Sequence, residues 1–149
     1  MQMTSRFTMA VHIITAIDYF KDERKITSDF LALSVGTNPV IIRNVIGRLK
    51  AAGIVSTRQG SADTALARPL EQITFYDVYA AVDCVDQSGL FHFHENPNTD
   101  CPVGRSIHAA MDQRLAAVQA AMEDELRRIT LADVVADARA AAGNAEGNG

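Results

Sequence analysis

Residues 26–60 restrict what this chain can fold into more than any other segment. They contain two short helical patterns on either side of a turn, followed by the start of a strand. Gly36 ends the first pattern, because a left-handed residue after a helix costs glycine little. Asn38 can cap the second helix, and Pro39 takes its first position, where a missing N–H does no harm. This order predicts a helix-turn-helix followed by a β-hairpin wing.

The second helix of this pair is amphipathic. Apolar residues recur at helical spacing on one side and predict a buried face, whereas cations and an amide occupy the other side. A basic face at this place is typical of a recognition helix that meets DNA. The apolar positions are Ile42, Val45, Ile46 and Leu49, and the polar face carries Arg43, Asn44, Gly47 and Arg48.

Helical patterns also flank this unit. Apolar spacing predicts a helix over residues 5–22, and Thr74 can cap another that reaches about Val85. A polar and aromatic loop follows at 86–101 and is a candidate sensor or effector loop. We therefore expect a mostly α-helical fold with a small β wing, in which residues 1–85 form a winged helix-turn-helix domain.

Residues 102–129 form the longest helical pattern. The mean spacing of about 3.7 residues between its apolar positions is that of a helical stripe. A helix of this length spans about 42 Å, which is more than a small domain can cover. The simplest partner is the same helix of a second copy, giving a two-fold dimer, and the alternative is packing on its own domain. The stripe consists of Val103, Ile107, Met111, Leu115, Val118, Met122, Leu126 and Ile129.

A short last helix is predicted after this stripe. Thr130 and Asp133 have the spacing of a capping box, and the helix is predicted to end near Ala142. Residues 102–142 would therefore hold the dimerisation helices. Residues 143–149 contain too little apolar surface to pack and are predicted to be a disordered tail.

The net charge of −4 conceals an uneven distribution. Residues 1–68 carry nine Lys and Arg against five Asp and Glu, whereas residues 69–149 carry five against thirteen. A local excess of positive charge is what a phosphate-facing surface needs, whatever the charge of the whole chain. A solvated face without a partner is the alternative, and the helix-turn-helix pattern favours contact with DNA.

Length and composition limit the kinds of protein that this chain can be. The chain has 149 residues and is 48% apolar, enough for about one domain with an additional element. No apolar run approaches the ~18 residues of a membrane span, and no secretory leader is expected before Phe7. Two cysteines cannot form a disulfide framework. We expect a cytoplasmic protein with reduced thiols and no membrane partner.

Five segments carry a resemblance to a known family. They are RFTMAVHIITAID, GTNPVIIRNVIGRLKAAGIV, LARPLEQITFYDVYAAVD, LFHFHENPNTDCPVG and ITLADV, and together they extend over roughly residues 5–135. In this order they are similar to the Rrf-two family of bacterial winged-helix regulators, which includes iron–sulfur, nitric-oxide and cysteine-metabolism sensors. The resemblance implies a homodimeric transcriptional regulator, most often a repressor, that binds a two-fold symmetric operator on double-stranded DNA.

Particular side chains are candidates for reading DNA. Arg43 has the planar fork that suits guanine, Asn44 can pair with adenine, and Val40 can contact a thymine methyl. Hydroxyls at helix starts bind phosphate, although each can also be a cap and nothing more. In relatives the wing carries paired glycines, where this chain has Ala62 and Asp63, and Asp63 would repel phosphate. The predicted contacts are Thr27, Ser28, Thr37, Asn38, Pro39, Val40, Arg43, Asn44, Arg48, Lys50, Arg58, Gln59 and Arg68.

The loop before the long helix holds the candidate sensing chemistry. Cluster-binding relatives use three cysteines there, but this chain has Cys101 alone, with Cys84 on the preceding helix. The resemblance therefore implies neither an iron–sulfur cluster nor another cofactor. His92, His94 and Cys101 are a weak metal-site candidate, since two histidines on an aromatic run are more often structural.

Cys101 itself is a candidate redox sensor. It precedes Pro102 and so lies near the N-terminus of the long helix, where the dipole and free N–H groups favour the thiolate. Oxidation there could shift the long helices. A helix start with a small buried side chain is the alternative.

Two other functional classes remain open at this point. A winged-helix module that binds proteins rather than DNA is the first alternative, and the basic face argues against it. A small thiol- or metal-dependent enzyme is the second, but the chain has no glycine-rich phosphate loop and no placed third catalytic group. We predict that the protein is not an enzyme.

Overall fold

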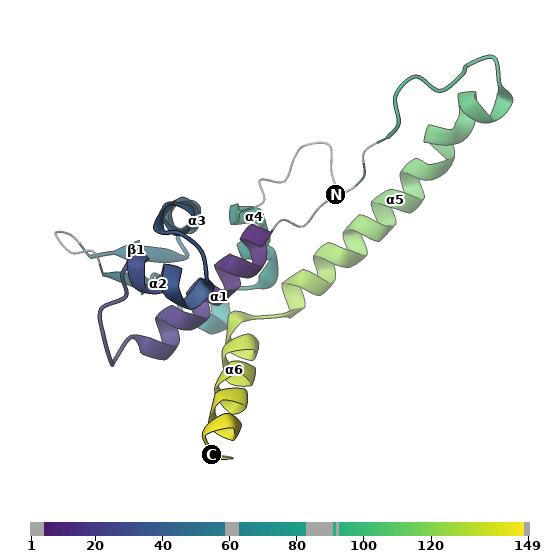
Figure 1. Cartoon of the computed structure of the whole chain (residues 1–149). Helices are drawn as coiled ribbons and strands as arrows, with labels where there is room; N and C mark the ends of the chain where they lie inside the picture. Colours follow the sequence, from purple (N-terminus) through teal and green to yellow (C-terminus); the bar gives the residue numbers. More distant parts are fainter. Residues whose placement is uncertain (1–4, 59–62, 83–90, 92, 148–149) are drawn as a thin grey trace.

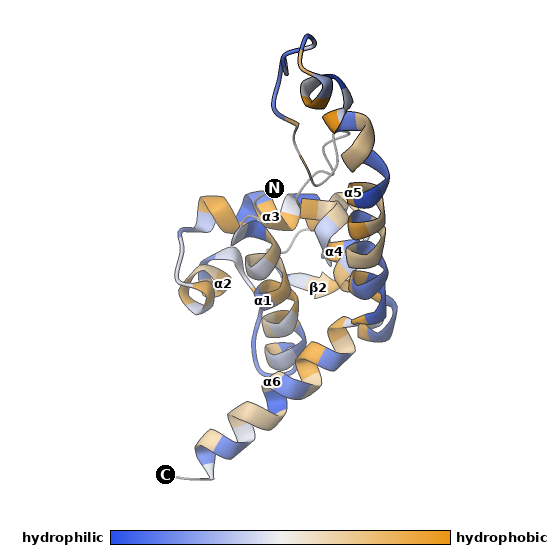
Figure 2. Cartoon of the chain, turned by 90° about the vertical axis from the view of Figure 1, so that its right-hand side faces the viewer, coloured by the Kyte–Doolittle hydropathy of each residue, from blue (hydrophilic) through white to orange (hydrophobic). Residues whose placement is uncertain are grey.

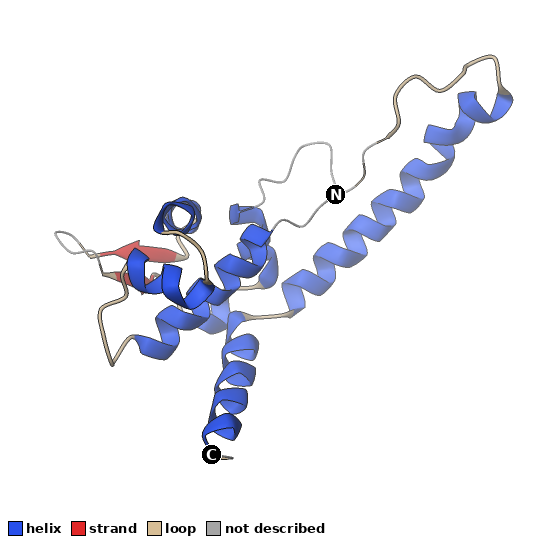
Figure 3. Ribbon diagram, viewed as in Figure 1, coloured by secondary structure: helices blue, strands red, loops and turns tan. Residues whose placement is uncertain are grey.

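The computed structural model of the chain describes residues 5–58, 63–82, 91 and 93–147. The described part is mainly helical with one two-stranded sheet (Figures 1 and 3). The predicted fold class is therefore confirmed. The elements are α1 (Ser5–Phe20), α2 (Ser28–Val35), α3 (Pro39–Ala51), β1 (Val55–Thr57), β2 (Thr64–Leu66), the 3-10 helix η1 (Leu70–Gln72), α4 (Phe75–Val82), α5 (Pro102–Arg128) and α6 (Leu131–Glu146).

Helices α1, α2 and α3 form the helix-turn-helix core, as predicted. The Thr27 side chain caps α2 by accepting the N–H of Phe30. Gly36 follows α2 with a φ of 82°, a backbone conformation that glycine adopts at little cost. The apolar face of α3 packs onto α1 and α2, where its four inward residues are buried. These four are Ile42, Val45, Ile46 and Leu49.

The wing is a short antiparallel hairpin next to α3. Strands β1 and β2 pair with Val55 opposite Leu66, and Gly53, with a φ of 74°, turns the chain from α3 toward β1. The hairpin is joined to the segment before α2, because the N–H of Thr64 donates to the Ile26 carbonyl at 2.9 Å. Residues 59–62, with Gln59 and the predicted wing-tip Ala62, lie outside the described residues.

Two capping boxes meet where the C-terminal region joins the core. The predicted pair of Thr130 and Asp133 is present at the start of α6. Thr74 and Asp77 make the same two hydrogen bonds at the start of α4. The two threonines face each other in a β-bridge, and the Leu131 N–H donates to the Ile73 carbonyl at 2.8 Å. This junction places the end of α5 and the start of α6 against the core.

Helix α5 projects away from the body of the molecule and meets it at its C-terminal end, close to where α6 begins (Figure 1). Of the residues of α5, only Leu126, near its C-terminal end, is buried. The buried Asp18 of α1 accepts from Arg139 of α6 at 3.0 Å and from Lys21 at 3.3 Å, which fixes α6 along α1. The hydropathy colouring shows apolar and polar residues interspersed along α5 (Figure 2).

Several predicted boundaries differ from the structure. Helix α1 ends at Phe20, two residues early, because the amides of Glu23 and Arg24 turn back to the Phe20 carbonyl. Helix α6 continues to Glu146, so residues 143–146 are helical rather than part of a disordered tail. Its many alanines have the highest helix propensity, and a single glycine, at a cost of about 1 kcal/mol, does not end such a helix.

No single helix in the described ranges is long and apolar enough to cross a membrane. The pair α2 and α3 reaches that length and apolarity only when taken together, across a bend of 108°.

Candidate nucleic-acid interface

The exposed face of α3 is the centre of the candidate interface. Asn38 caps the helix by accepting the Ile41 N–H at 3.0 Å, and Pro39 follows as its first residue. Val40 is 60% exposed despite being apolar, and Arg43 and Asn44 are exposed one turn later. Among the residues that the structure describes, no hydrogen bond or ion pair engages the Arg43 guanidinium. These side chains share one accessible strip at the N-terminal half of α3.

Gly47 lies on the same exposed strip and contributes no side chain to it. It is exposed, and a Cβ added to it would meet no atom within 4 Å. Close packing within the chain therefore does not explain the glycine. A glycine on an exposed helix costs about 1 kcal/mol relative to alanine, so its presence suggests that something outside the chain approaches the backbone.

Arg6 is a candidate that sequence reasoning missed. It begins α1 and lines the same open hollow as Asn44 and Arg48 of α3. Residues 6 and 44 are far apart in the chain, and no spacing rule connects them. The structure thus adds Arg6 to the cations beside the exposed face of α3.

Arg48 and Lys50 both make hydrogen bonds within the chain, so their charges are less available for contact with DNA. Arg48 is half-buried and donates through Nη1 to the Val82 carbonyl at 3.2 Å, so it joins α3 to the last residue of α4. Lys50 is exposed and donates through Nζ to Thr57 Oγ1 in β1 at 2.8 Å. To make its predicted contact with DNA, the Arg48 guanidinium would therefore have to bind a phosphate and the Val82 carbonyl at the same time.

The hydroxyl residues of the interface lie at the helix starts. Thr27 is half-buried and uses its Oγ1 to cap α2, and Ser28 is the first residue of that helix. Thr37 is half-buried in the turn between α2 and α3, and its N–H donates to the Ala32 carbonyl at 3.0 Å. Thr27 and Asn38 thus have the capping role that sequence reasoning gave as the alternative.

Asp63 bonds to the segment before α2. Its Oδ1 accepts the Ile26 N–H at 2.9 Å, and its Oδ2 lies 3.7 Å from Nε of Arg58. The Asp63 side chain is 18% exposed and that of Arg58 is 75% exposed. The carboxylate therefore holds the wing onto the segment before α2, and a nearby cation offsets its charge.

We expect replacement of Asp63 by Ala to destabilise the fold by about 1–3 kcal/mol, because it leaves the part-buried Ile26 N–H without its charged acceptor. Urea unfolding followed by circular dichroism measures this loss. The Asp63→Asn variant retains an acceptor oxygen and should lose less. Equal stability of the wild type and the alanine variant would show that this contact is not needed.

Arg68 lies away from the exposed strip. Its Nη2 is 3.9 Å from Asp77 Oδ2, its side chain is 32% exposed, and its Nε is buried without a hydrogen-bond partner among the described residues. The structure therefore groups Arg68 with the start of α4. Gln59 lies outside the described residues, so the structure brings together only part of the predicted wing contacts.

Cys101 lies immediately before α5, as predicted. Backbone amides of Gly104 and then Val103 lower the pKa of the Cys101 thiol, because their N–H groups stabilise the thiolate, and desolvation opposes this only in part. Gly104 is tightly placed, since an added Cβ would collide with the Asn98 carbonyl oxygen. The loop at Asn98 and the first turn of α5 are therefore in close contact.

The matching family model extends over residues 3–137 and is described as "Rrf2: Iron-dependent Transcriptional regulator". The chain belongs to the Rrf2 family. YwnA of Bacillus subtilis (strain 168), named as an HTH-type transcriptional regulator, is 41% identical over 133 residues, which are 89% of this chain and 96% of YwnA. The Rrf2 resemblance drawn from the sequence is therefore confirmed.

Solved structures agree with this membership. A crystal structure of a protein described as DNA-binding is 38% identical, with a TM-score of 0.70, and the match covers 87% of this chain and 98% of that one. IscR of T. potens is 20% identical, with a TM-score of 0.66, over 93% of this chain and 88% of IscR, and it shares the fold. This Rrf2 protein is thus a DNA-binding transcriptional regulator, and the small-enzyme alternative is excluded.

The description of the Rrf2 model names iron, which the described residues of this chain do not test. No three His, Cys, Asp or Glu side chains among them come together as ligands of a metal ion. His94 is exposed and its ring lies 5.5 Å from that of His108, which also contacts Phe93. His92 and Cys84 lie outside the described residues, so the weak candidate set of His92, His94 and Cys101 stays untested.

Proposed function

We propose that the chain is a homodimeric repressor whose two α3 helices enter adjacent major grooves of a two-fold symmetric operator. The observation that carries this proposal is the exposed strip of α3, which presents Val40, Arg43 and Asn44 while the opposite face is buried. In winged-helix dimers the two recognition helices lie about one helical turn, roughly 34 Å, apart. The proposal places the protein in the cytoplasm, where the DNA of its bacterial relatives lies.

Base contacts in this proposal come from the strip, and phosphate contacts come from its surroundings. Arg43 would meet guanine O6 and N7, and Asn44 would meet adenine. Arg6 beside α3 and the exposed Arg58 of the wing would add positive charge toward the phosphates. A protein-binding winged helix has no need of this arrangement of cations around an open helix face.

The dimer in this proposal forms through α5. The helix has 27 residues, and its apolar stripe is exposed at Val103 (67%) and Val118 (53%) and half-buried at most of its other positions. A continuous apolar stripe on a helix that leaves the body is typical of a surface that a partner covers. A second copy is the simplest partner, because the same stripe then covers itself about a two-fold axis.

The Gly47→Ala variant tests the proposal. We expect it to raise the free energy of unfolding by about 0.5–1 kcal/mol, since alanine is the better helix former and the position is open. We also expect weaker DNA binding, because the added methyl would meet the backbone that α3 approaches. Urea unfolding and a gel-shift titration measure the two effects. A variant that is more stable and binds DNA as well as the wild type would contradict the placement of α3.

We further propose that Cys101 makes the regulator responsive to oxidants, with no cofactor. The lowered pKa of its thiol supports this proposal. The thiolate sulfur would attack one oxygen of hydrogen peroxide, the O–O bond would break, and hydroxide would leave, giving a sulfenic acid. The change would occur at the start of α5, the helix that we assign to the dimer.

The pKa of Cys101 gives a direct test in a Cys84→Ser background. Because the pKa is lowered in the folded chain, we expect iodoacetamide to react faster at pH 7 with the folded chain than with the urea-unfolded one. The pH midpoint of the reaction should also be lower when the chain is folded. Identical midpoints, or DNA binding that peroxide leaves unchanged, would remove Cys101 from the proposal.

A further inference from the structure

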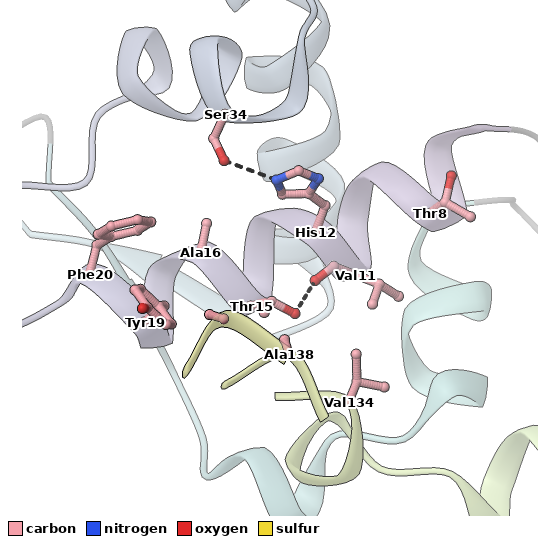
Figure 4. A pocket seen from close by; sticks show the side chains of 11 residues that line it. Thr8, Val11, His12, Thr15, Ala16, Tyr19, Phe20, Ser34, Val134 and Ala138 are labelled. Atoms are coloured by element: carbon pink, nitrogen blue, oxygen red, sulfur yellow. Dashed lines mark hydrogen bonds between the residues drawn. The ribbon is translucent and has the colours of Figure 1, made fainter. Parts of the chain in front are cut away.

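Helices α1 and α6 leave an open hollow of about 590 Å³ between them, next to the last turn of α2 (Figure 4). Helix α6 is held beside this hollow on another face, where Leu131 and Val135 are buried and Arg139 reaches Asp18. On the face toward the hollow, α6 presents Val134 and two alanines, Ala138 and Ala142. The small alanine side chains leave the space open while the helix itself is fixed.

The walls of the hollow are mainly apolar. No Lys, Arg, Asp or Glu is among the described residues that line it. Tyr19 and Phe20 supply aromatic rings at one end (Figure 4). The hydroxyls of Thr8 and Thr15 already donate to carbonyls within α1, at 3.0 and 2.8 Å. The polar groups on the threonines therefore add little to the hydrogen-bonding capacity of the wall.

One polar pair stands at the edge of this apolar space. Nε2 of His12 in α1 lies 2.9 Å from Oγ of Ser34 in α2, and the ring and the hydroxyl can each donate or accept (Figure 4). Small-molecule sites are typically hollows of about 300–1,000 Å³ with apolar and aromatic walls and a few placed polar groups. The hollow has this volume and this distribution of groups.

We propose that the hollow between α1 and α6 binds an uncharged, mainly aromatic small molecule that has one hydrogen-bonding group directed at His12 and Ser34. The apolar body of the ligand would lie between the rings of Tyr19 and Phe20 and the alanine face of α6. A charged ligand is disfavoured, because its charge would lose water without meeting an opposite charge on the wall. This site is separate from the α3 strip and from Cys101.

The position of the hollow gives the ligand a route to DNA binding, and this part rests on the proposed function. Ser34 belongs to the last turn of α2, and α3 begins five residues later. A ligand that bonds to His12 or Ser34 competes with the bond between them, which joins α2 to α1. We therefore expect an occupied site to weaken DNA binding by at least about fivefold.

The experiment uses the full chain and an uncharged fluorescent probe, N-phenyl-1-naphthylamine, whose emission rises in apolar surroundings. We expect saturable binding, reduced at least tenfold by Ala138→Phe, which fills the hollow. The matched control is Ala136→Phe, on an exposed face of the same helix, and it should bind as the wild type does. Unchanged binding by a folded Ala138→Phe variant would overturn the proposal.

Two further measurements keep the test decisive if that variant does not fold. Nuclear Overhauser contacts in the wild-type chain should connect the probe to the methyl groups of Ala138 and Ala142, and contacts to α5 instead would overturn the site. The sulfonated analogue 8-anilinonaphthalene-1-sulfonate should bind at least tenfold more weakly. Equal binding of the two probes would overturn the assignment to uncharged ligands.

The remaining outcomes separate the ligand site from its effect on DNA. Probe binding is measured without DNA, so this test of the ligand site does not depend on the proposed function. A bound probe that changes DNA affinity less than twofold would overturn the coupling while leaving the site. A chain that binds no probe and becomes monomeric on Ala138→Phe would show that a second copy covers the hollow, which overturns the proposal.

Discussion

The Arg43→Ala variant should bind its specific DNA about 5- to 150-fold more weakly than the wild type, corresponding to about 1–3 kcal/mol. The side chain is exposed on α3 and, among the described residues, its guanidinium has no hydrogen bond or ion pair to lose. Its removal should therefore leave the fold unchanged. Because a bidentate arginine discriminates guanine from other bases, the preference at one operator position should also relax.

Gel-shift titrations on specific and on unrelated DNA measure this effect, with urea unfolding as the check on stability. The matched control is Arg114→Ala, which removes an exposed arginine from α5 far along the chain and should change specific binding little. If Arg43→Ala and Arg114→Ala weaken binding equally, or if neither does, Arg43 does not read a base.

Two glutamates on the apolar stripe of α5 should have the largest effect of all. In the double variant Met111→Glu and Val118→Glu, each copy would have to bury two charges in the interface, which costs far more than leaving them in water. We expect monomers at concentrations at which the wild type is a dimer. We also expect specific DNA affinity to fall at least about 100-fold, because two linked recognition helices bind with much higher avidity than one.

Sedimentation velocity and gel-shift titrations provide the two readouts. The control places two glutamates on the other face of the same helix, at the exposed Gln113 and Ala120, and should remain dimeric. The stripe residue Val118 is 53% exposed in the single chain, so its replacement should leave the fold of one copy intact. A double stripe variant that stays dimeric would show that α5 is not the dimer interface.

Local features of the fold could be predicted from the sequence. Caps and helix ends depend on residues within one turn of each other, and so the Thr130–Asp133 box and the glycine end of α2 follow from spacing alone. The amphipathic pattern of α3 likewise identified its buried face. The end of α6 could not be placed from the sequence. It depends on the difference in helix propensity between alanine and glycine, and the free energy of that difference is smaller than that of tertiary contacts.

Long-range contacts could not be predicted. The bond from Asp63 to the Ile26 N–H joins residues 37 apart, and that from Arg139 to Asp18 joins residues 121 apart. Neither has a periodic signal in the sequence. For this reason the sequence predicted only that Asp63 repels phosphate. It likewise predicted only a DNA contact for Arg48, whose guanidinium also donates to the Val82 carbonyl.

The exposed strip of α3 was nevertheless located correctly, because its residues alternate with the buried face at the helical period. What the sequence could not show is how that strip is extended by other elements. Arg6 of α1 joins it through the packing of α1 on α3. The roles of these residues on DNA remain predictions from their exposure and chemistry.

Selection of binding sites from a pool of random duplex DNA tests the central claim most directly. If two copies present α3 to adjacent major grooves, the selected sequences should be inverted repeats whose half-sites are centred about 10 base pairs apart. The half-sites should lose one preferred guanine when Arg43→Ala is used in the same selection. Enrichment of a single asymmetric site, or no enrichment at all, would contradict the account.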